Sequence, residues 1–220
     1  MRNYFSETFR QFESYFSSIE HEERSYLKTN SIKAFNKPMD EMFYIRAGTI
    51  AASSLHESGH IKAFSFYGEG YLAPLYFPGT GDEFRALSFD ALTELDVYVF
   101  ERKKFLRYLQ GNQELNDTMY SAYIDLVGML LIENINQLFS SGMEKICNFF
   151  YMYLENGEKK DHVIDLSQNQ ILEFVGLNRA NLAKYLKILR EQGIISTYRN
   201  QIEVKDILRL REYCSAEEDD

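Results

Sequence analysis

Cysteine is scarce in this sequence, and the two that it contains, Cys147 and Cys214, lie far apart. A disulfide-rich scaffold, or an iron–sulfur cluster held by four thiolates, needs more cysteines, so both are excluded. Three prolines and twelve glycines exclude collagen-like and linker-like chains, and a hydrophobic content of 45% excludes a disordered one. We therefore expect a globular protein with a buried core.

Long hydrophobic runs are also missing. The longest one covers residues 126–132 and contains Gly128. A helix that crosses a membrane needs about 20 apolar residues, so we expect no membrane partner. The first residues include Arg2, Glu7 and Glu13 and lack the apolar stretch of a secretory signal. We expect a soluble, cytoplasmic protein.

The chain is short of positive charge, because 24 Lys and Arg stand against 33 Asp and Glu, a net charge of −9. An acidic protein is a poor partner for a polyanion such as DNA. The deficit is unevenly distributed, however: residues 166–211 carry a net charge of +4, whereas residues 111–165 carry −6 and residues 212–220 carry −5. The basic segment is where we expect a nucleic-acid contact.

Two kinds of pattern occupy residues 1–110. The spacing of Phe5, Phe9, Phe12 and Phe16 predicts a helix with one apolar face. From about residue 28 to residue 100, short apolar or alternating runs are separated by glycine-containing turns, which is typical of a small antiparallel barrel or jelly roll. The clearest predicted strands are residues 42–45, 49–52, 61–66 and 95–100.

Two rows of mostly apolar residues run along a long helix predicted for residues 112–138. One row is Tyr120, Ile124, Val127, Leu131, Asn134 and Leu138, and the other is Leu115, Met119, Ala122, Leu126, Met129 and Glu133. A helix that is apolar on two faces must be covered on both. We expect the chain's own roll to cover one face and a second copy of the chain to cover the other. The alternative is the central helix of a monomer.

A helix-turn-helix is predicted for residues 166–189. Ser167 and Asn178 stand at the N-cap positions of the two helices, and Gly176 stands in the turn, where the backbone conformation is costly for other residues. The inward positions are Ile171, Val175, Leu177, Leu182, Leu186 and Leu189. The alternative is an ordinary solvated helical hairpin.

The outward face of the second helix carries basic and amide side chains. In a helix-turn-helix this helix enters the major groove, where Arg bonds guanine, Asn bonds adenine, and Lys serves guanine or phosphate. Residues 194–204 predict two short strands around Arg199 and Asn200, a wing that would touch the sugar–phosphate backbone. We expect double-stranded DNA as the partner, and the predicted DNA-binding residues are Arg179, Asn181, Lys184, Lys187, Ser167, Asn178 and Arg199.

The order of roll, long helix, hinge and winged helix-turn-helix resembles the Crp/Fnr superfamily of bacterial transcription regulators. The strongest matches are Met42-Phe43-Tyr44-Ile45-Arg46-Ala47-Gly48, similar to a strand and turn of the family, and residues 166–189. The resemblance implies an α+β fold with three parts. These are an antiparallel, cyclic-nucleotide-binding-like β-roll at residues 1–110, a dimerisation helix and hinge at residues 111–140, and a winged helix-turn-helix domain at residues 141–220.

The resemblance also implies partners and an operator. The chain would form a homodimer through residues 112–138, bind a palindromic DNA site, respond to a small-molecule effector and contact RNA polymerase. Much of the family carries Arg-Glu-x-x-x-Arg on the recognition helix, where this chain has Arg179, Ala180 and Lys184. Its operator preference should therefore differ from that of the founding member.

The effector site departs further from the family pattern. Cyclic-nucleotide binders carry Gly-Glu-Leu, whereas here Gly70, Tyr71, Leu72 and Ala73 put a tyrosine at the ribose-binding position, and Arg85 falls on the phosphate-binding position. We expect these five residues to bind an effector other than a cyclic nucleotide. The aromatic stretch Tyr67, Tyr71, Tyr76, Phe77 and Phe84 suits a small apolar or aromatic ligand with one polar group. The alternatives are a cyclic nucleotide, or aromatics that are simply core with Arg85 on a surface strand.

Two other functions fit a roll joined to a helical domain. One is a metal-dependent jelly-roll enzyme, but His56 and His60 are spaced by four and are better interpreted as solvated loop residues. The other is a sensor that binds a protein partner instead of DNA. We predict no catalytic residue, no metal and no cofactor.

Overall fold

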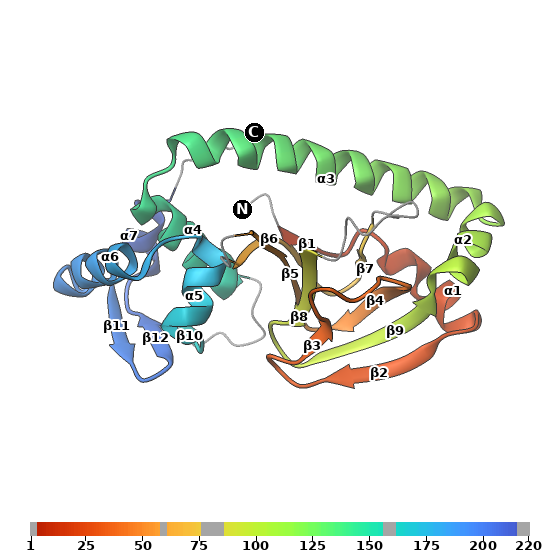
Figure 1. Cartoon of the computed structure of the whole chain (residues 1–220), viewed down its shortest axis with the longest axis horizontal. Coiled ribbons are helices and arrows are strands. Elements are labelled where there is room, and N and C mark those ends of the chain that lie inside the picture. Colours follow the sequence, from red (N-terminus) through yellow and green to blue (C-terminus); the bar gives the residue numbers. More distant parts are fainter. Residues whose placement is uncertain (1–3, 58–60, 76–85, 156–161, 215–220) are drawn as a thin grey trace. The chain divides into compact units, whose positions relative to one another are not determined.

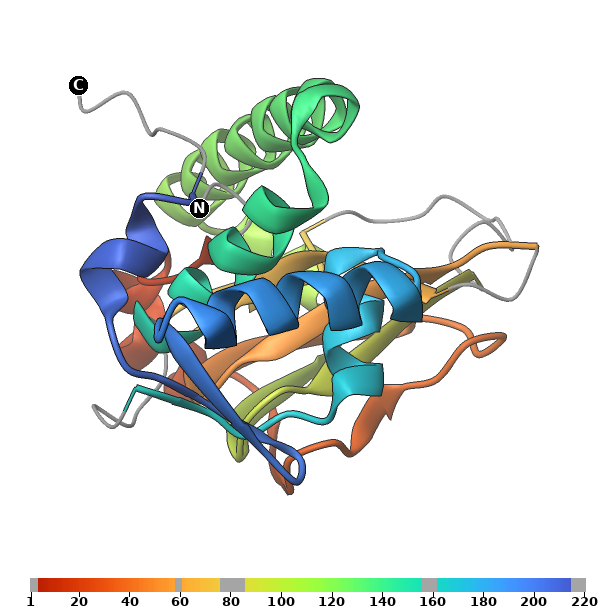
Figure 2. The ribbon, with the colours of Figure 1, turned by 90° about the vertical axis from the view of Figure 1, so that its left-hand side faces the viewer.

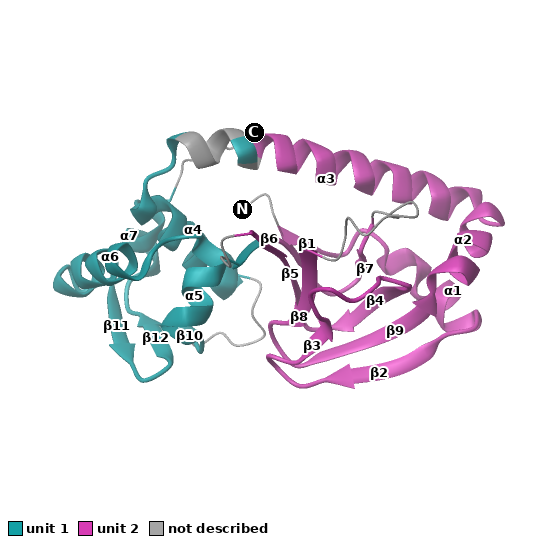
Figure 3. Ribbon diagram, viewed as in Figure 1, with its two compact units in different colours: residues 1, 61–63, 134–220 teal, residues 2–60, 64–133 magenta. Residues whose placement is uncertain are grey.

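The computed structural model describes residues 4–57, 61–75, 86–155 and 162–214 (Figure 1). The chain forms two compact units (Figure 3). The N-terminal unit contains residues 2–60 and 64–133, and the C-terminal unit contains residues 61–63 and 134–220 together with residue 1.

Two sheets build the roll. The first has the order β1-β6-β5-β8-β3, with strands Tyr4–Phe5, Ile61–Tyr67, Ile50–Leu55, Leu87–Ala91 and Ser31–Lys33. The second has the order β2-β9-β4-β7, with strands Glu22–Tyr26, Leu95–Glu101, Glu41–Ala47 and Leu72–Ala73. Strand β4 pairs antiparallel with β9 in a register that places Tyr44 opposite Tyr98. Buried side chains of both sheets belong to one core, and in β4 four consecutive residues, Met42 to Ile45, are buried in it.

Helices close this core. The N-terminal unit has a 3-10 helix η1 (Arg10–Phe12) and the α-helices α1 (Glu13–Ser18), α2 (Arg102–Gln110) and α3 (Gln113–Phe139), of which the last runs on into the C-terminal unit. One row of α3 packs into the same core as the roll: Leu115, Met119, Ala122, Leu126 and Met129, all at most 7% exposed. The other apolar row leaves large side chains exposed: Tyr120, Ile124, Val127 and Leu131. Over residues 115–131, whose side chains the structure describes, the two-faced helix predicted from the spacing is confirmed.

Besides the end of α3, the C-terminal unit contains four helices and a small sheet among its described residues. The helices are α4 (Gly142–Glu155), α5 (Gln168–Val175), α6 (Arg179–Glu191) and α7 (Ile207–Arg211). The sheet has the order β10-β12-β11, with strands Val163–Ile164, Gln201–Val204 and Ile195–Tyr198. The predicted α+β fold class, with a roll, a long helix and a winged helix-turn-helix, is confirmed.

One predicted element is wrong in part. Phe5 belongs to β1, which pairs parallel with β6, and is not part of a helix. The spacing suggested a single helix because Phe9, Phe12 and Phe16 do share a buried face. These three residues lie just before η1, at its end and in α1. No helix among the described residues has the length and apolar character that crossing a membrane requires. The boundaries of the three predicted parts at residues 110 and 140 stay a prediction.

Candidate nucleic-acid interface and effector site

Helix α5 begins with a capping box. The Ser167 hydroxyl accepts a hydrogen bond from the Gln170 amide at 3.3 Å, and the Gln170 side-chain oxygen accepts one from the Ser167 amide at 2.9 Å. This pair satisfies two donors that a helix N-terminus otherwise leaves free. Helix α5 ends at Gly176, whose φ of +65° is left-handed. The sequence predicted both the cap and the glycine turn.

Helix α6 begins at Arg179, three residues after that glycine. Asn178 is its N-cap, and its side-chain oxygen accepts a hydrogen bond from the Asn181 amide at 2.9 Å. Five of the six inward positions are buried, namely Ile171, Val175, Leu182, Leu186 and Leu189, and Leu177 is half-buried. The two helices are therefore held by both caps and packing, which fixes what their other faces present.

The face of α6 opposite this packing is polar and basic. Arg179, Asn181, Lys184 and Lys187 are all exposed, as the sequence predicted. Lys187 lies 3.7 Å from Glu191 in an exposed i,i+4 pair, and the Lys184 ammonium lies 5.6 Å from the centre of the Tyr185 ring. Figure 2 shows α6 with α5 crossing behind it and the β11–β12 hairpin beside them.

The hairpin of β11 and β12 forms the predicted wing. Tyr198 is opposite Gln201, and the turn between them contains Arg199, which is exposed, and Asn200, whose φ is +56°. A positive φ is tolerated best by glycine and asparagine, so Asn200 suits this tight turn. The wing is tied to α6, because Arg190 donates to the Thr197 hydroxyl at 2.9 Å.

The sequence missed one contact in this interface. The Arg179 guanidinium donates from Nη2 to the side-chain oxygen of Asn169, on α5, at 2.8 Å. The two residues are ten positions apart, so neither helical nor strand periodicity pairs them. Comparison with the known geometry of a helix-turn-helix could have predicted that Asn169 contacts Arg179.

Helix α4 begins at Gly142, just after the dimerisation helix and hinge predicted for residues 111–140. Gly142 packs against the Tyr185 ring of α6, and a Cβ at this position would lie 2.5 Å from Cε2 of that ring. Only a residue without a side chain allows this approach. The residue at the start of α4 is thus in direct contact with α6 of the same unit.

The predicted effector residues 70–73 follow β6. Gly70, with a φ of +73°, donates its amide to the Ile45 carbonyl at 2.8 Å and accepts a hydrogen bond from the Phe9 amide, also at 2.8 Å. Leu72 and Ala73 form β7, which pairs with β4. Arg85 lies outside the described residues, as do Tyr76, Phe77 and Phe84.

Tyr71 is 1% exposed and is surrounded by aromatic rings. Its ring stacks on Tyr67 with centroids 5.6 Å apart and on Phe5 at 5.5 Å, and it meets Phe9 edge-on at 5.4 Å. The hydroxyls of Tyr71, Tyr67 and Ser65 are buried without a hydrogen-bond partner of normal geometry among the described residues. Burial raises the pKa of Tyr67 to about 12, although the nearby Ser65 hydroxyl opposes the shift.

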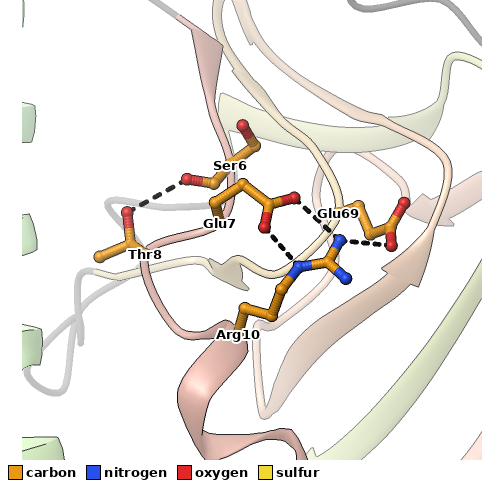
Figure 4. A network of polar contacts seen from close by, with 5 residues as sticks. All are labelled: Ser6, Glu7, Thr8, Arg10 and Glu69. Atoms are coloured by element: carbon orange, nitrogen blue, oxygen red, sulfur yellow. Dashed lines mark hydrogen bonds and ion pairs between the residues drawn. The ribbon is translucent and has the colours of Figure 1, made fainter.

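The N-terminal segment covers this turn. Arg10 bonds both Glu7 and Glu69, at 2.9 Å and 2.5 Å from its Nη2 atom, and the Thr8 hydroxyl donates to the Ser6 carbonyl (Figure 4). A Cβ on Gly68 would lie 1.9 Å from the Tyr4 hydroxyl. The segment therefore lies directly on the loop that joins β6 to β7. Exposed ion pairs of this kind contribute little to stability, so the attachment of the segment depends more on the aromatic contacts.

The remaining candidates for metal binding or catalysis are the histidines and cysteines. Among the described residues, no three His, Cys, Asp or Glu side chains are placed to hold a metal ion. His56 is exposed, and His60 lies outside the described residues. Cys147 is buried, and burial raises the pKa of its thiol to about 12, as expected for a core cysteine.

Comparison with known proteins identifies the C-terminal domain. Residues 144–213 match the sequence profile of the Crp-like helix-turn-helix domain. This range contains the capped helices, the basic face and the wing. Among curated proteins, none matches the chain.

Several solved structures share the fold. FixK2 from Bradyrhizobium japonicum is 18% identical, with a TM-score of 0.69 over 90% of this chain and 100% of its own. The c-di-GMP-responsive global regulator CLP of Xanthomonas campestris is 14% identical, with a TM-score of 0.71 over 89% and 98%. A transcriptional regulator of the crp/fnr family from Eubacterium rectale, described as putative, is 13% identical, with a TM-score of 0.72 over 90% and 92%. The resemblance inferred from the sequence is confirmed for the helix-turn-helix domain and for the fold.

Proposed function

We propose that this chain, which joins a Crp-like helix-turn-helix domain to the fold of the Crp/Fnr regulators, is a homodimeric transcription regulator controlled by a small molecule. The observation that carries the proposal is the face of α6. Arg179 and Lys184 are exposed on a helix whose opposite face is buried, and a wing lies beside it. This is the arrangement with which a helix enters the major groove while a hairpin contacts phosphates.

The residues divide into base readers and backbone contacts. Arg179 is the first residue of α6 and Asn181 the third, so both reach base edges, where Arg suits guanine and Asn suits adenine. Lys187, a turn or two further along, and Arg199 on the wing contact phosphates. Ser167 and Asn178 place helix N-termini, which favour anions, towards the DNA backbone.

A second copy of the chain covers the exposed row of α3. Tyr120 and Leu131 are 67% and 63% exposed, and Ile124 between them is 52% exposed. An apolar stripe of this size on a long helix is typical of a coiled-coil-like dimer interface. A two-fold dimer would present two α6 helices to half-sites about one DNA turn apart, and hence a palindromic operator.

The effector is a small molecule other than a cyclic nucleotide, bound at residues 70–73 with Arg85. A buried Tyr71 replaces the ribose-binding carboxylate, and the surrounding rings favour an apolar or aromatic ligand. The unpaired hydroxyls of Tyr67 and Tyr71 favour one polar group on that ligand.

Selection of DNA sites from a random pool tests the proposal, with and without cyclic AMP and a panel of small aromatic acids. We expect a palindrome whose half-sites are about 10 base pairs apart, enriched more strongly by one of the aromatic ligands than by cyclic AMP. Enrichment of no sequence under any condition would contradict DNA recognition, and enrichment by cyclic AMP alone would contradict the effector class.

A further inference from the structure

The contact between Asn169 and Arg179 joins the two helices of the helix-turn-helix on their exposed side. Asn169 is the second residue of α5 and Arg179 is the first residue of α6. Their hydrogen bond of 2.8 Å is made by side chains that are both exposed. It therefore lies on the surface that the proposed function places against DNA.

The backbone on both sides of this bond is fixed independently of it. The capping box of Ser167 fixes the first turn of α5, and the Asn178 cap fixes the first turn of α6. Ile171 and Leu182 are fully buried in the packing between them. Removing the bond would therefore free only the Arg179 side chain and leave both helices in place.

An amide is a suitable partner for an arginine that must still bind DNA. The Asn169 oxygen accepts one N–H of five and leaves the positive charge of the guanidinium intact, whereas a carboxylate would neutralise it and compete with guanine. Neither α5 nor α6 has an acidic residue in its first turn. Arg179 thus keeps enough donors on Nη1 and Nη2 for a bidentate bond to guanine O6 and N7.

We propose that Asn169 is a positioning residue for base recognition, which holds the Arg179 guanidinium in the orientation that binds guanine. The proposal rests on the proposed function, in which α6 enters the major groove. A free arginine loses much rotational freedom when it binds, and a side chain already held in the bound orientation loses less. Asn169 therefore raises both affinity and selectivity at the one base pair that Arg179 contacts in each half-site.

A double-mutant cycle tests the proposal in the full-length protein. The dissociation constants of wild type, Asn169→Ala, Arg179→Ala and the double variant are measured on the selected operator. They are also measured on operators changed at each base pair in turn. We expect Asn169→Ala to weaken binding to the selected operator by about 3- to 10-fold, the scale of one hydrogen bond. It should have no effect on an operator that lacks the base pair contacted by Arg179, and none in the Arg179→Ala background.

The outcomes separate the two proposals. Selectivity lost by Arg179→Ala but retained by Asn169→Ala would overturn the positioning role alone. Equal weakening of all operators by Asn169→Ala, with a smaller salt dependence, would also overturn it, because that is the signature of a phosphate contact. Selectivity unchanged by Arg179→Ala would overturn the recognition mode itself and the positioning role with it. Gln168→Ala, at the exposed neighbour in the same turn, is the matched control and should keep wild-type selectivity.

Discussion

At the residue scale, the turn between β4 and β5 depends on Gly48. Its φ is +88°, and a Cβ at this position would lie 2.0 Å from the Glu94 carbonyl oxygen. Gly48→Ala should lower the free energy of unfolding by about 3 kcal/mol or more, because left-handed strain and a backbone clash add. Gly193→Ala is the matched control, since Gly193 has a φ of +72° with nothing within 4 Å of its Cβ position. It should lose only about 1–2 kcal/mol in urea unfolding, and equal losses at the two sites would contradict the clash.

Buried tyrosines make the roll sensitive to alkali. Burial raises the pKa of Tyr67 to about 12 and raises that of Tyr71 as well, whereas an unfolded tyrosine titrates near pH 10. Because the folded state holds these hydroxyl protons more tightly than the unfolded state, the free energy of unfolding is unaffected by their titration below about pH 10. It falls as the pH rises from about 10 towards about 12. Urea unfolding should therefore show stability falling more steeply above pH 10 in wild type than in Tyr67→Phe, by up to about 1.4 kcal/mol per pH unit. Equal slopes for wild type and Tyr67→Phe would contradict the assignment of this pH dependence to Tyr67.

At the element scale, the first turn of α5 depends on its cap. Ser167→Ala removes the acceptor for the Gln170 amide and should cost about 1 kcal/mol, while Ser167→Gly should cost only a few tenths. Hydrogen exchange at the Gln170 amide, compared among the three proteins, measures the loss locally. Faster exchange in the glycine variant than in the alanine variant would argue against this cap.

The sequence predicted elements well where their burial pattern is regular. The rows of α3, the caps of α5 and α6, and the wing around Arg199 were all predicted, because each depends on local spacing or on one capping residue. Strand β2 was missed because Glu22–Tyr26 is polar and mostly exposed, so it lacks the alternation that predicts a strand. Phe5 was assigned to a helix because its parallel pairing with β6 involves residues about 60 positions away.

At the scale of the whole molecule, the sequence predicted the order of the parts but not what brings distant residues together. The Asn169–Arg179 bond and the packing of Phe5 and Phe9 on Tyr71 depend on turns and tertiary contacts that no local pattern encodes. Among the effector residues, the sequence matched Tyr71 to a position of the family pattern, but it could not predict which side chains surround Tyr71. The predicted DNA-binding and effector residues remain predictions of function, although the exposure or burial of each one except Arg85, which lies outside the described residues, is now described.

Dimerisation through α3 is the prediction that belongs to the assembly. Leu131→Asp places a charge in the exposed apolar row, twice in a two-fold dimer, and should weaken association by about 100-fold or more. Ser121→Asp is the control, because Ser121 is an exposed polar residue of the same helix outside the apolar row, and it should leave association nearly unchanged. Sedimentation equilibrium measures both. A Leu131→Asp protein that remains a dimer would move the interface elsewhere.

Recognition of DNA sequence by α6 through Arg179 is tested by measuring binding to operators changed at each base pair in turn. Arg179→Ala should lose about 1–3 kcal/mol at one base pair per half-site and bind the remaining positions as wild type does. Lys187→Ala should weaken all sequences alike and flatten the salt dependence. An Arg179→Ala protein that discriminates among operators as wild type does would contradict base recognition by Arg179.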